Sequence, residues 1–231
     1  SGPTDVIAFP AEQTEEGRSG EVIVCVSVAE EQAQEQGHSL LRELAVLVAH
    51  GTLHTVGHRD DTETGRQVMA DLQERLYAEN RYALLICLQA MDAAGKDGAI
   101  KHVMTGLNPQ GTQVVAFKQP SSEELDHDYL WRIGRALPRR GEVGIFNRSH
   151  YEEVIVAKVH NLVANQQLPK ELVDDGIWQQ RYRQINDFEQ YLYENGIRTV
   201  KIYLNLSKDE QRDRLLDRIN EPDKNWKFSS G

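Results

Sequence analysis

The chain has 231 residues, enough for one large or two small domains that each bury a core. Its formal net charge is −10, and the excess of acid lies in front: residues 1–64 carry 12 Asp and Glu against 3 Lys and Arg, whereas residues 65–231 carry 24 against 23. An acidic front segment is a poor electrostatic match for nucleic acid. The shift in composition also predicts two modules, 1–64 and 65–231.

Cysteine content and hydropathy narrow the class of protein further. Cys25 and Cys87 both lie in apolar runs, which favours free buried thiols and a reducing compartment over a disulfide scaffold. No apolar stretch approaches the roughly 20 residues needed to cross a bilayer, and the first residues lack a signal-peptide pattern. We therefore expect a soluble, cytoplasmic protein with no membrane partner.

The front segment predicts one strand followed by helices. Residues 20–28 form a β-branched run typical of a strand, and residues 29–37 have helix-forming composition. Apolar residues then recur at helical spacing from Leu40, which predicts a largely buried helix that ends at Gly57. Residues 62–80 predict a second, amphipathic helix.

After residue 80 the pattern alternates between short apolar strands and helical stretches. This alternation is typical of an α/β fold, a parallel sheet with helices on its faces. The expected strands are residues 82–89, 112–118, 141–147 and 198–206.

Residues 89–98, QAMDAAGKDG, follow the first of these strands and resemble a phosphate-binding loop. The usual pattern is G-x-x-x-x-G-K-[ST], and here Ala90 replaces the first glycine and Asp97 the Ser or Thr. Backbone N–H groups and Lys96 would then bind phosphate. Because Asp97 has no hydroxyl for Mg²⁺, Asp92 is the candidate metal ligand. The alternative is an ordinary strand-to-helix turn with a surface lysine.

Several motifs in the rear half resemble the polyphosphate kinase 2 family from about Leu72 to Phe228. They are LQERLYAEN, LQAMDAAGKDGAIKHVMTGLNPQG, FKQPSSEELDHDYLWRI, ALPRRGEVGIFNRSHYEEV, RYRQINDFEQYLYENG and NWKFS. The resemblance implies a parallel-sheet P-loop kinase-like domain that transfers phosphate between inorganic polyphosphate and nucleoside mono- or diphosphates with Mg²⁺.

The resemblance also implies roles for individual residues. Lys96 and Arg148 would contact phosphate, Asp92 and Asn147 would lie near Mg²⁺, and Asn at position 147 resembles the subgroup that uses both nucleoside mono- and diphosphates. The helical segment after NRSHYEEV would belong to a lid. The full phosphate- and nucleotide-binding set is Ala93, Ala94, Gly95, Lys96, Asp97, Gly98, Lys118 and Arg148.

Other charged residues in these motifs have no single role from the sequence alone. For each of four arginines in these motifs, the sequence fits a solvated or ion-paired surface side chain as well as it fits a side chain that contacts substrate. His150 and Glu152 are better explained as structural than as catalytic. The arginines concerned are Arg132, Arg139, Arg140 and Arg181.

The front segment carries a separate constellation of metal ligands. His50 and His54 are four residues apart on the predicted buried helix, with His58 and Asp60 just beyond Gly57, which suits zinc. Residues 4–70 resemble the YbeY family of zinc-dependent endoribonucleases of rRNA maturation, a small zincin-like α+β fold. The family pattern H-x3-H-x5-H implies Asp60 as the third ligand, with His58 as the alternative.

Both resemblances look incomplete: the front lacks the first elements of its family, and the rear is truncated at its C-terminal end. Three functions follow as hypotheses. The first is a polyphosphate:nucleotide phosphotransferase, and the second a metal-dependent ribonuclease acting on RNA, which the acidic front disfavours. The third is a folded chimera with little activity. A homo-oligomer is compatible with all three.

Overall fold

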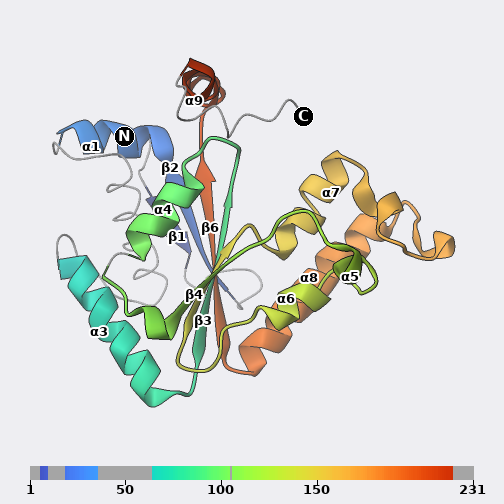
Figure 1. Ribbon diagram of the computed structural model, residues 1–231, viewed down its shortest axis with the longest axis horizontal. Coiled ribbons are helices and arrows are strands. Elements are labelled where there is room, and N and C mark those ends of the chain that lie inside the picture. Colours follow the sequence, from blue (N-terminus) through green and yellow to red (C-terminus); the bar gives the residue numbers. More distant parts are fainter. Residues whose placement is uncertain (1–5, 10–18, 36–63, 105, 221–231) are drawn as a thin grey trace.

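The computed structural model describes residues 6–9, 19–35, 64–104 and 106–220 (Figure 1). The expected helix from Leu40 to Gly57 lies outside the described residues. The proposed zinc ligands His50, His54, His58 and Asp60 lie outside them as well.

A six-stranded sheet forms the centre of the molecule, with strand order β1-β2-β6-β3-β5-β4. Strand β1 pairs antiparallel with β2, and all other neighbours are parallel. The predicted α/β fold with a parallel sheet is therefore confirmed. The strands are β1 Val6–Phe9, β2 Ser19–Cys25, β3 Ala83–Ala90, β4 Thr112–Ala116, β5 Val143–Asn147 and β6 Ile197–Asn205.

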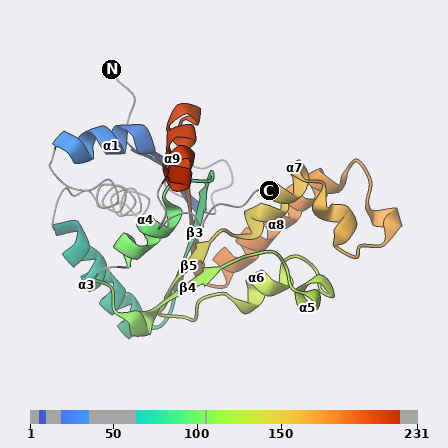
Figure 2. The same ribbon diagram turned by 45° about the horizontal axis from the view of Figure 1, so that its top comes forward.

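Helices cover both faces of this sheet, which gives three layers (Figures 1 and 2). Side chains that alternate along a strand reach opposite faces, so β3 sends Ile86 and Leu88 into one core and Leu85 and Cys87 into the other. The first core is shared with α1, α3 and α4, and the second with α6 and α8. These helices are α1 Val26–Glu35, α3 Thr64–Glu79, α4 Lys96–Val103, α6 Trp131–Arg135 and α8 Ile177–Glu194.

Further helices lie in the connections between these elements: η2 precedes β4, and the others follow the carboxyl ends of parallel strands. Helix α5 lies between β4 and α6, three short helices and α7 lie between β5 and α8, and α9 follows β6. None of the helices in the described part of the chain is long and apolar enough to cross a membrane. The bounds are η2 Pro109–Gly111, α5 Ser122–Leu125, η3 His150–Glu153, α7 Val156–Val159, η4 Leu162–Asn165, η5 Lys170–Leu172 and α9 Lys208–Asn220.

Two expectations about the front segment are corrected. Residues 26–28 are helical rather than strand, because Val26, Ala29 and Ala33 bury one helical face at spacings of three and four residues. Both cysteines are free, as predicted, but only Cys87 is buried, whereas Cys25 is half-buried. Burial raises the pKa of the Cys87 thiol.

The front segment shares the sheet of the rear segment. Strand β2 pairs with β6 along its whole length, from Ser19 beside Thr199 to Cys25 beside Asn205. Val22 and Val24 are buried in the same core as Leu204. The division into modules 1–64 and 65–231 stays a prediction, but the sheet and one core extend across it.

We expect Val24→Ala to lower the free energy of unfolding of the whole chain by about 2 kcal/mol, since it opens a cavity in the shared core. Ile23→Ala is the matched control, because Ile23 lies on the same strand but is 39% exposed. Urea denaturation measures both. A fluorescence transition of Trp131 or Trp178 that Val24→Ala leaves unchanged would contradict a shared core.

Candidate phosphate-binding site

The predicted phosphate loop lies between a buried strand and the start of a helix. Ala90 is the last residue of β3 and α4 begins at Lys96, so Ala at the first glycine position has ordinary extended backbone. The first N–H groups of α4 face the loop, and the positive end of the helix favours an anion there. This placement agrees with a phosphate loop.

The loop backbone alternates in handedness. Ala93 has φ 67° and Gly95 φ 88°, whereas Ala94 between them has a negative φ. Such alternation turns successive N–H groups toward one side and forms a concave anion-binding nest. Gly95 reaches this conformation without steric cost, and the buried Ala93 does so at a cost that is common at functional sites.

Strand β5 ends directly beside this loop. Asn147 lies opposite Leu88 in the register of β3 and β5, and the Arg148 N–H donates to the Leu88 carbonyl at 3.1 Å. Asn147 Nδ2 donates to Asp97 Oδ1 at 2.8 Å, which joins the end of β5 to the first turn of α4. The predicted residues of the loop and of β5 therefore meet at one edge of the sheet.

Lys96 is half-buried among charged side chains. Burial lowers the pKa of Lys96, and the positive charge of Arg148 lowers it further, while the carboxylates of Glu152, Asp97 and Asp92 act in the opposite direction. Two cations with three carboxylates around them are a suitable arrangement for an anion accompanied by a divalent metal.

This electrostatic setting predicts how phosphate binding depends on pH. A phosphate anion favours protonated Lys96, so affinity should be full below the pKa of Lys96 in the free protein and fall as pH rises through it. Because that pKa is lowered, the fall should begin below the usual lysine range. Calorimetric titration with tripolyphosphate between pH 7 and 10 measures this, and Lys96→Arg should move the fall to higher pH. An equal fall in Lys96→Arg would contradict the assignment.

The donor set at this edge suits Mg²⁺. Asp92 and Asp97 offer hard carboxylate oxygens, and Asn147 holds Asp97 in place. In the part of the chain that the structure describes, no three His, Cys, Asp or Glu side chains are grouped to hold a metal by themselves. Proteins usually bind Mg²⁺ through one or two carboxylates together with substrate phosphates.

Lys118 lies two residues past the end of β4, at the same edge of the sheet. Its side chain is exposed, and it follows a strand two places from β3, roughly 10 Å away. Its carbonyl accepts a hydrogen bond from Arg132 Nη1 at 2.9 Å. The role of Lys118 in phosphate binding stays a prediction.

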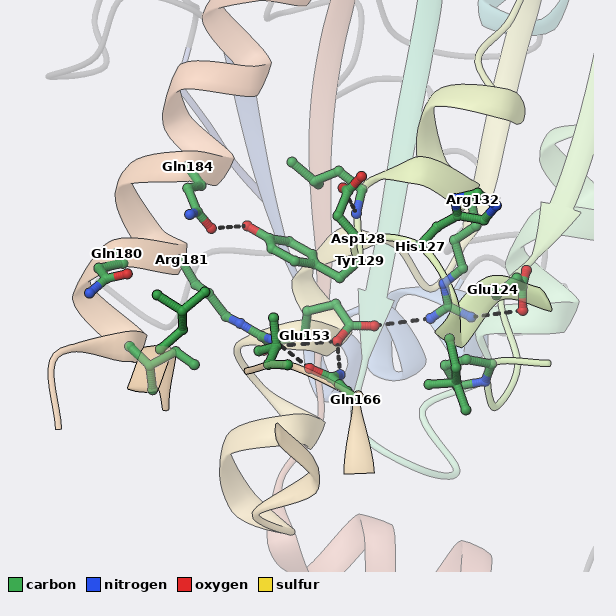
Figure 3. Close-up of a pocket in the computed structure, with 16 residues that line it drawn as sticks. Glu124, His127, Asp128, Tyr129, Arg132, Glu153, Gln166, Gln180, Arg181 and Gln184 are labelled. Carbon is green, nitrogen blue, oxygen red and sulfur yellow. Dashed lines mark hydrogen bonds and ion pairs between the residues drawn. The ribbon is translucent and has the colours of Figure 1, made fainter. Parts of the chain in front are cut away.

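Arg132 and Arg181 are not on the surface: both are buried, on either side of Glu153 (Figure 3). Arg132 Nη2 donates to Glu153 Oε1 at 3.1 Å, and Arg181 Nη1 donates to the Glu153 carbonyl at 3.0 Å. The three side chains border a cavity of about 370 Å³, where Tyr129 lies over the Arg181 guanidinium. Burial raises the pKa of Tyr129 to about 12.

The remaining candidates divide between surface, core and site. Arg139 and Arg140 are exposed, and Arg140 donates to the Arg81 carbonyl at 2.9 Å. His150 is buried against Glu189, which agrees with the structural role expected for it. Glu152 is half-buried and acts electrostatically on Lys96, so it lies close to the phosphate loop.

Helix α9 supplies contacts that the sequence analysis missed. Gln211 Nε2 donates to the Asp92 carbonyl at 2.9 Å, and Arg214 Nη1 donates to the Ala93 carbonyl at 3.4 Å. Both bonds join α9 to carbonyl groups of the loop. No local pattern in residues 208–220 indicated these contacts.

Known proteins from two organisms match the larger part of this chain. An ADP-polyphosphate phosphotransferase of Rhodopseudomonas palustris is 56% identical over 164 residues, 70% of this chain and 57% of the relative. An AMP/ADP-polyphosphate phosphotransferase of Meiothermus ruber is 50% identical over 160 residues, 69% of this chain and 56% of the relative. The chain thus spans little more than half the length of these relatives.

A solved structure and two family models also match the chain. The crystal structure of polyphosphate kinase 2 from Arthrobacter aurescens superposes with a TM-score of 0.64 at 45% identity, covering 71% of this chain and 56% of that one. The model of endoribonuclease YbeY matches residues 1–81, and the model of polyphosphate kinase 2 matches residues 55–231. Because the latter model matches most of its length, the chain belongs to the polyphosphate kinase 2 family.

Proposed function

We propose that the chain transfers phosphate between inorganic polyphosphate and nucleoside mono- or diphosphates. The observation that carries this proposal is the position of Lys96, which begins a helix directly after a buried parallel strand and has Arg148 and three carboxylates around it. The names of the relatives support it, since they are ADP- and AMP/ADP-polyphosphate phosphotransferases.

Phosphoryl transfer requires positioning and positive charge around the transferring group. Lys96 and the loop N–H groups would hold the phosphates on one side, and Arg148 would meet them from the end of β5. Lys118, at the mouth of the site, would bind the polyphosphate chain further out. These cations lie on ends of adjacent strands and on a helix, so little reorganisation is needed when substrate binds.

A magnesium ion would be held by Asp92, with Asp97 and Asn147 next to it, and would neutralise charge on the phosphate oxygens. Asn147 keeps its side-chain oxygen available because its Nδ2 donates to Asp97. In this proposal the Asn147–Asp97 pair takes the place of the hydroxyl that the usual loop pattern provides. The acceptor is an ADP or AMP, as the names of the relatives suggest.

The test is incubation of the purified chain with long-chain polyphosphate, Mg²⁺ and either AMP or ADP. Chromatography should show ADP or ATP forming, and omission of polyphosphate should abolish the product. Absence of product with both acceptors, in a sample whose unfolding transition is cooperative, would overturn the proposed function.

The front segment supports a second proposal, zinc binding, which the match to the YbeY model favours. We expect one zinc ion per chain, bound by His50, His54 and Asp60, because two imidazoles four residues apart on a helix need only one more donor. Cleavage of RNA should be weak or absent, since residues 1–64 contain 12 acidic and only 3 basic residues and should repel the RNA phosphates. Elemental analysis of protein purified without chelator measures the zinc. A metal content that His50→Ala leaves unchanged would contradict the assignment.

A further inference from the structure

Arg148 occupies a backbone conformation that residues other than glycine rarely adopt. Its φ is 64°, in the left-handed region, yet its side chain is exposed, and its charge is close enough to Lys96 to lower the pKa of that lysine. Ser149 and His150, which follow it, are both 0% exposed. A strained residue between a strand end and a buried turn persists only where the surroundings hold it, and such residues concentrate at functional sites.

On one side, β3 holds the backbone of this turn. The Arg148 N–H donates to the Leu88 carbonyl at 3.1 Å, and Gln89 Nε2 donates to Ser149 Oγ at 2.9 Å. The same Oγ accepts from the Tyr151 N–H at 3.3 Å, which closes the first turn of η3. The start of the turn is therefore fixed to the strand that carries the phosphate loop.

On the other side, a single carboxylate on α8 holds the turn. Glu189 is 1% exposed, and its Oε1 accepts from the Tyr151 hydroxyl at 2.6 Å and faces His150 Nε2 at 3.2 Å. Its Oε2 faces Lys201 Nζ of β6 at 3.4 Å. Burial acts to raise the pKa of Glu189, but the bonds from His150 and Tyr151 and the charge of Lys201 outweigh it and hold the pKa below its ordinary value.

The lowered pKa of Glu189 favours its carboxylate form, which only accepts hydrogen bonds; with that form, His150 Nε2 is the donor to Glu189. Two of its three partners are the second and third residues after Arg148. A displacement of either would move the Arg148 backbone, because only a short, tightly bonded turn separates them.

We propose that Glu189 is a positioning residue for Arg148: through His150 and Tyr151 it holds the left-handed turn that directs the Arg148 guanidinium to the transferring phosphate. This inference rests on the proposed function for its catalytic consequence. Its structural part, control of the Arg148 backbone, is independent of that function and can be measured separately.

The experiment is a double-mutant cycle with Glu189→Gln and Arg148→Ala, assayed with long-chain polyphosphate and ADP. Glu189→Gln should lower kcat about 10-fold, with KM changed less than about 2-fold, since a small misplacement of a catalytic group mainly affects the transition state. In the Arg148→Ala background the same substitution should cost less than about 2-fold. Tyr151→Phe removes one hydrogen bond to Glu189 and should lower kcat by a smaller factor. This variant keeps the inference testable if Glu189→Gln does not fold.

The matched control is Asp187→Asn, which removes a charge from an exposed position of the same helix, where Asp187 pairs with Arg183. Hydrogen exchange gives the second readout: in Glu189→Gln the Arg148 amide should exchange faster while that of the buried Ile86 is unchanged, and Asp187→Asn should change neither. An equal loss of kcat in both Arg148 backgrounds, or unaltered exchange at Arg148, would overturn the inference. If the wild type transfers no phosphate, the proposed function fails, and the exchange result alone decides the inference.

Discussion

Glu153→Gln should lower the free energy of unfolding by about 3 kcal/mol, because it removes the carboxylate charge beside the buried Arg181 and leaves the buried Arg132 with only Glu124, at 3.7 Å, among the residues that the structure describes. Arg132 and Arg181 are 9% and 3% exposed, and Glu153 itself is 4% exposed. The carboxylate also accepts a hydrogen bond from Gln166 Nε2 at 2.6 Å, so it connects α6, η4 and α8 around one point (Figure 3). Urea denaturation followed by circular dichroism measures the loss.

The matched control for this prediction is Glu123→Gln. Glu123 pairs with Arg135 at 3.6 Å, but the side chains are 71% and 65% exposed, so solvent screens the pair. Its loss should change stability by less than about 0.5 kcal/mol. If the two substitutions lowered the free energy of unfolding equally, burial of Glu153 would not increase its contribution to stability. That result would contradict the prediction that its charge compensates the buried arginines.

Features of the fold that depend on neighbouring residues were predicted well. Each strand of the rear half is a short β-branched or apolar run, and the observed bounds differ from the predicted ones by at most two residues, as for 82–89 against Ala83–Ala90. The placement of residues 91–95 between a strand and a helix belongs to the same class, because strand, glycine and lysine are adjacent in the chain. Such signals need no knowledge of tertiary contacts.

Contacts between distant parts of the chain could not be read from the sequence in this way. Gln211 and Asp92 are 119 residues apart in the chain. The sequence around either residue does not predict a hydrogen bond between them. Asn147 and Asp97 are 50 residues apart and are a second example. The family resemblance implied a position near the metal for Asn147, but it did not imply a hydrogen bond to Asp97. A charged residue also gives no local sign of its burial, which is why Arg132 and Arg181 stayed ambiguous.

The pairing of β2 with β6 shows the same limit at the level of a whole element. The β-branched run at residues 20–28 indicated a strand, but a strand's composition does not say which neighbour it joins. The register places β2 parallel to β6, so the front segment forms one side of the kinase-like sheet. Its start was predicted within one residue, whereas its end was not, because Val26 fits both a strand and a buried helix face.

Lys96→Ala should lower kcat/KM for polyphosphate-dependent phosphorylation of ADP about 1,000-fold, the upper end of the loss when one preorganised donor is removed from a transition state. The fold should be retained, since alanine favours the first turn of a helix and the substitution removes a half-buried charge. Steady-state kinetics with a parallel melting curve measures both effects.

Lys101→Ala is the matched control, because Lys101 is an exposed lysine on the same helix, and it should change kcat/KM less than about 2-fold. Calorimetry with tripolyphosphate then separates two roles for Lys96. If affinity and turnover fall together, Lys96 binds ground state and transition state alike; if turnover falls while affinity holds, its bond forms mainly in the transition state. Unchanged affinity and unchanged turnover would remove Lys96 from the site and, with it, the interpretation of residues 90–98 as a phosphate loop. The two lysines differ in burial and in charged neighbours rather than in chemistry, so a difference between them measures what the position at the end of β3 contributes.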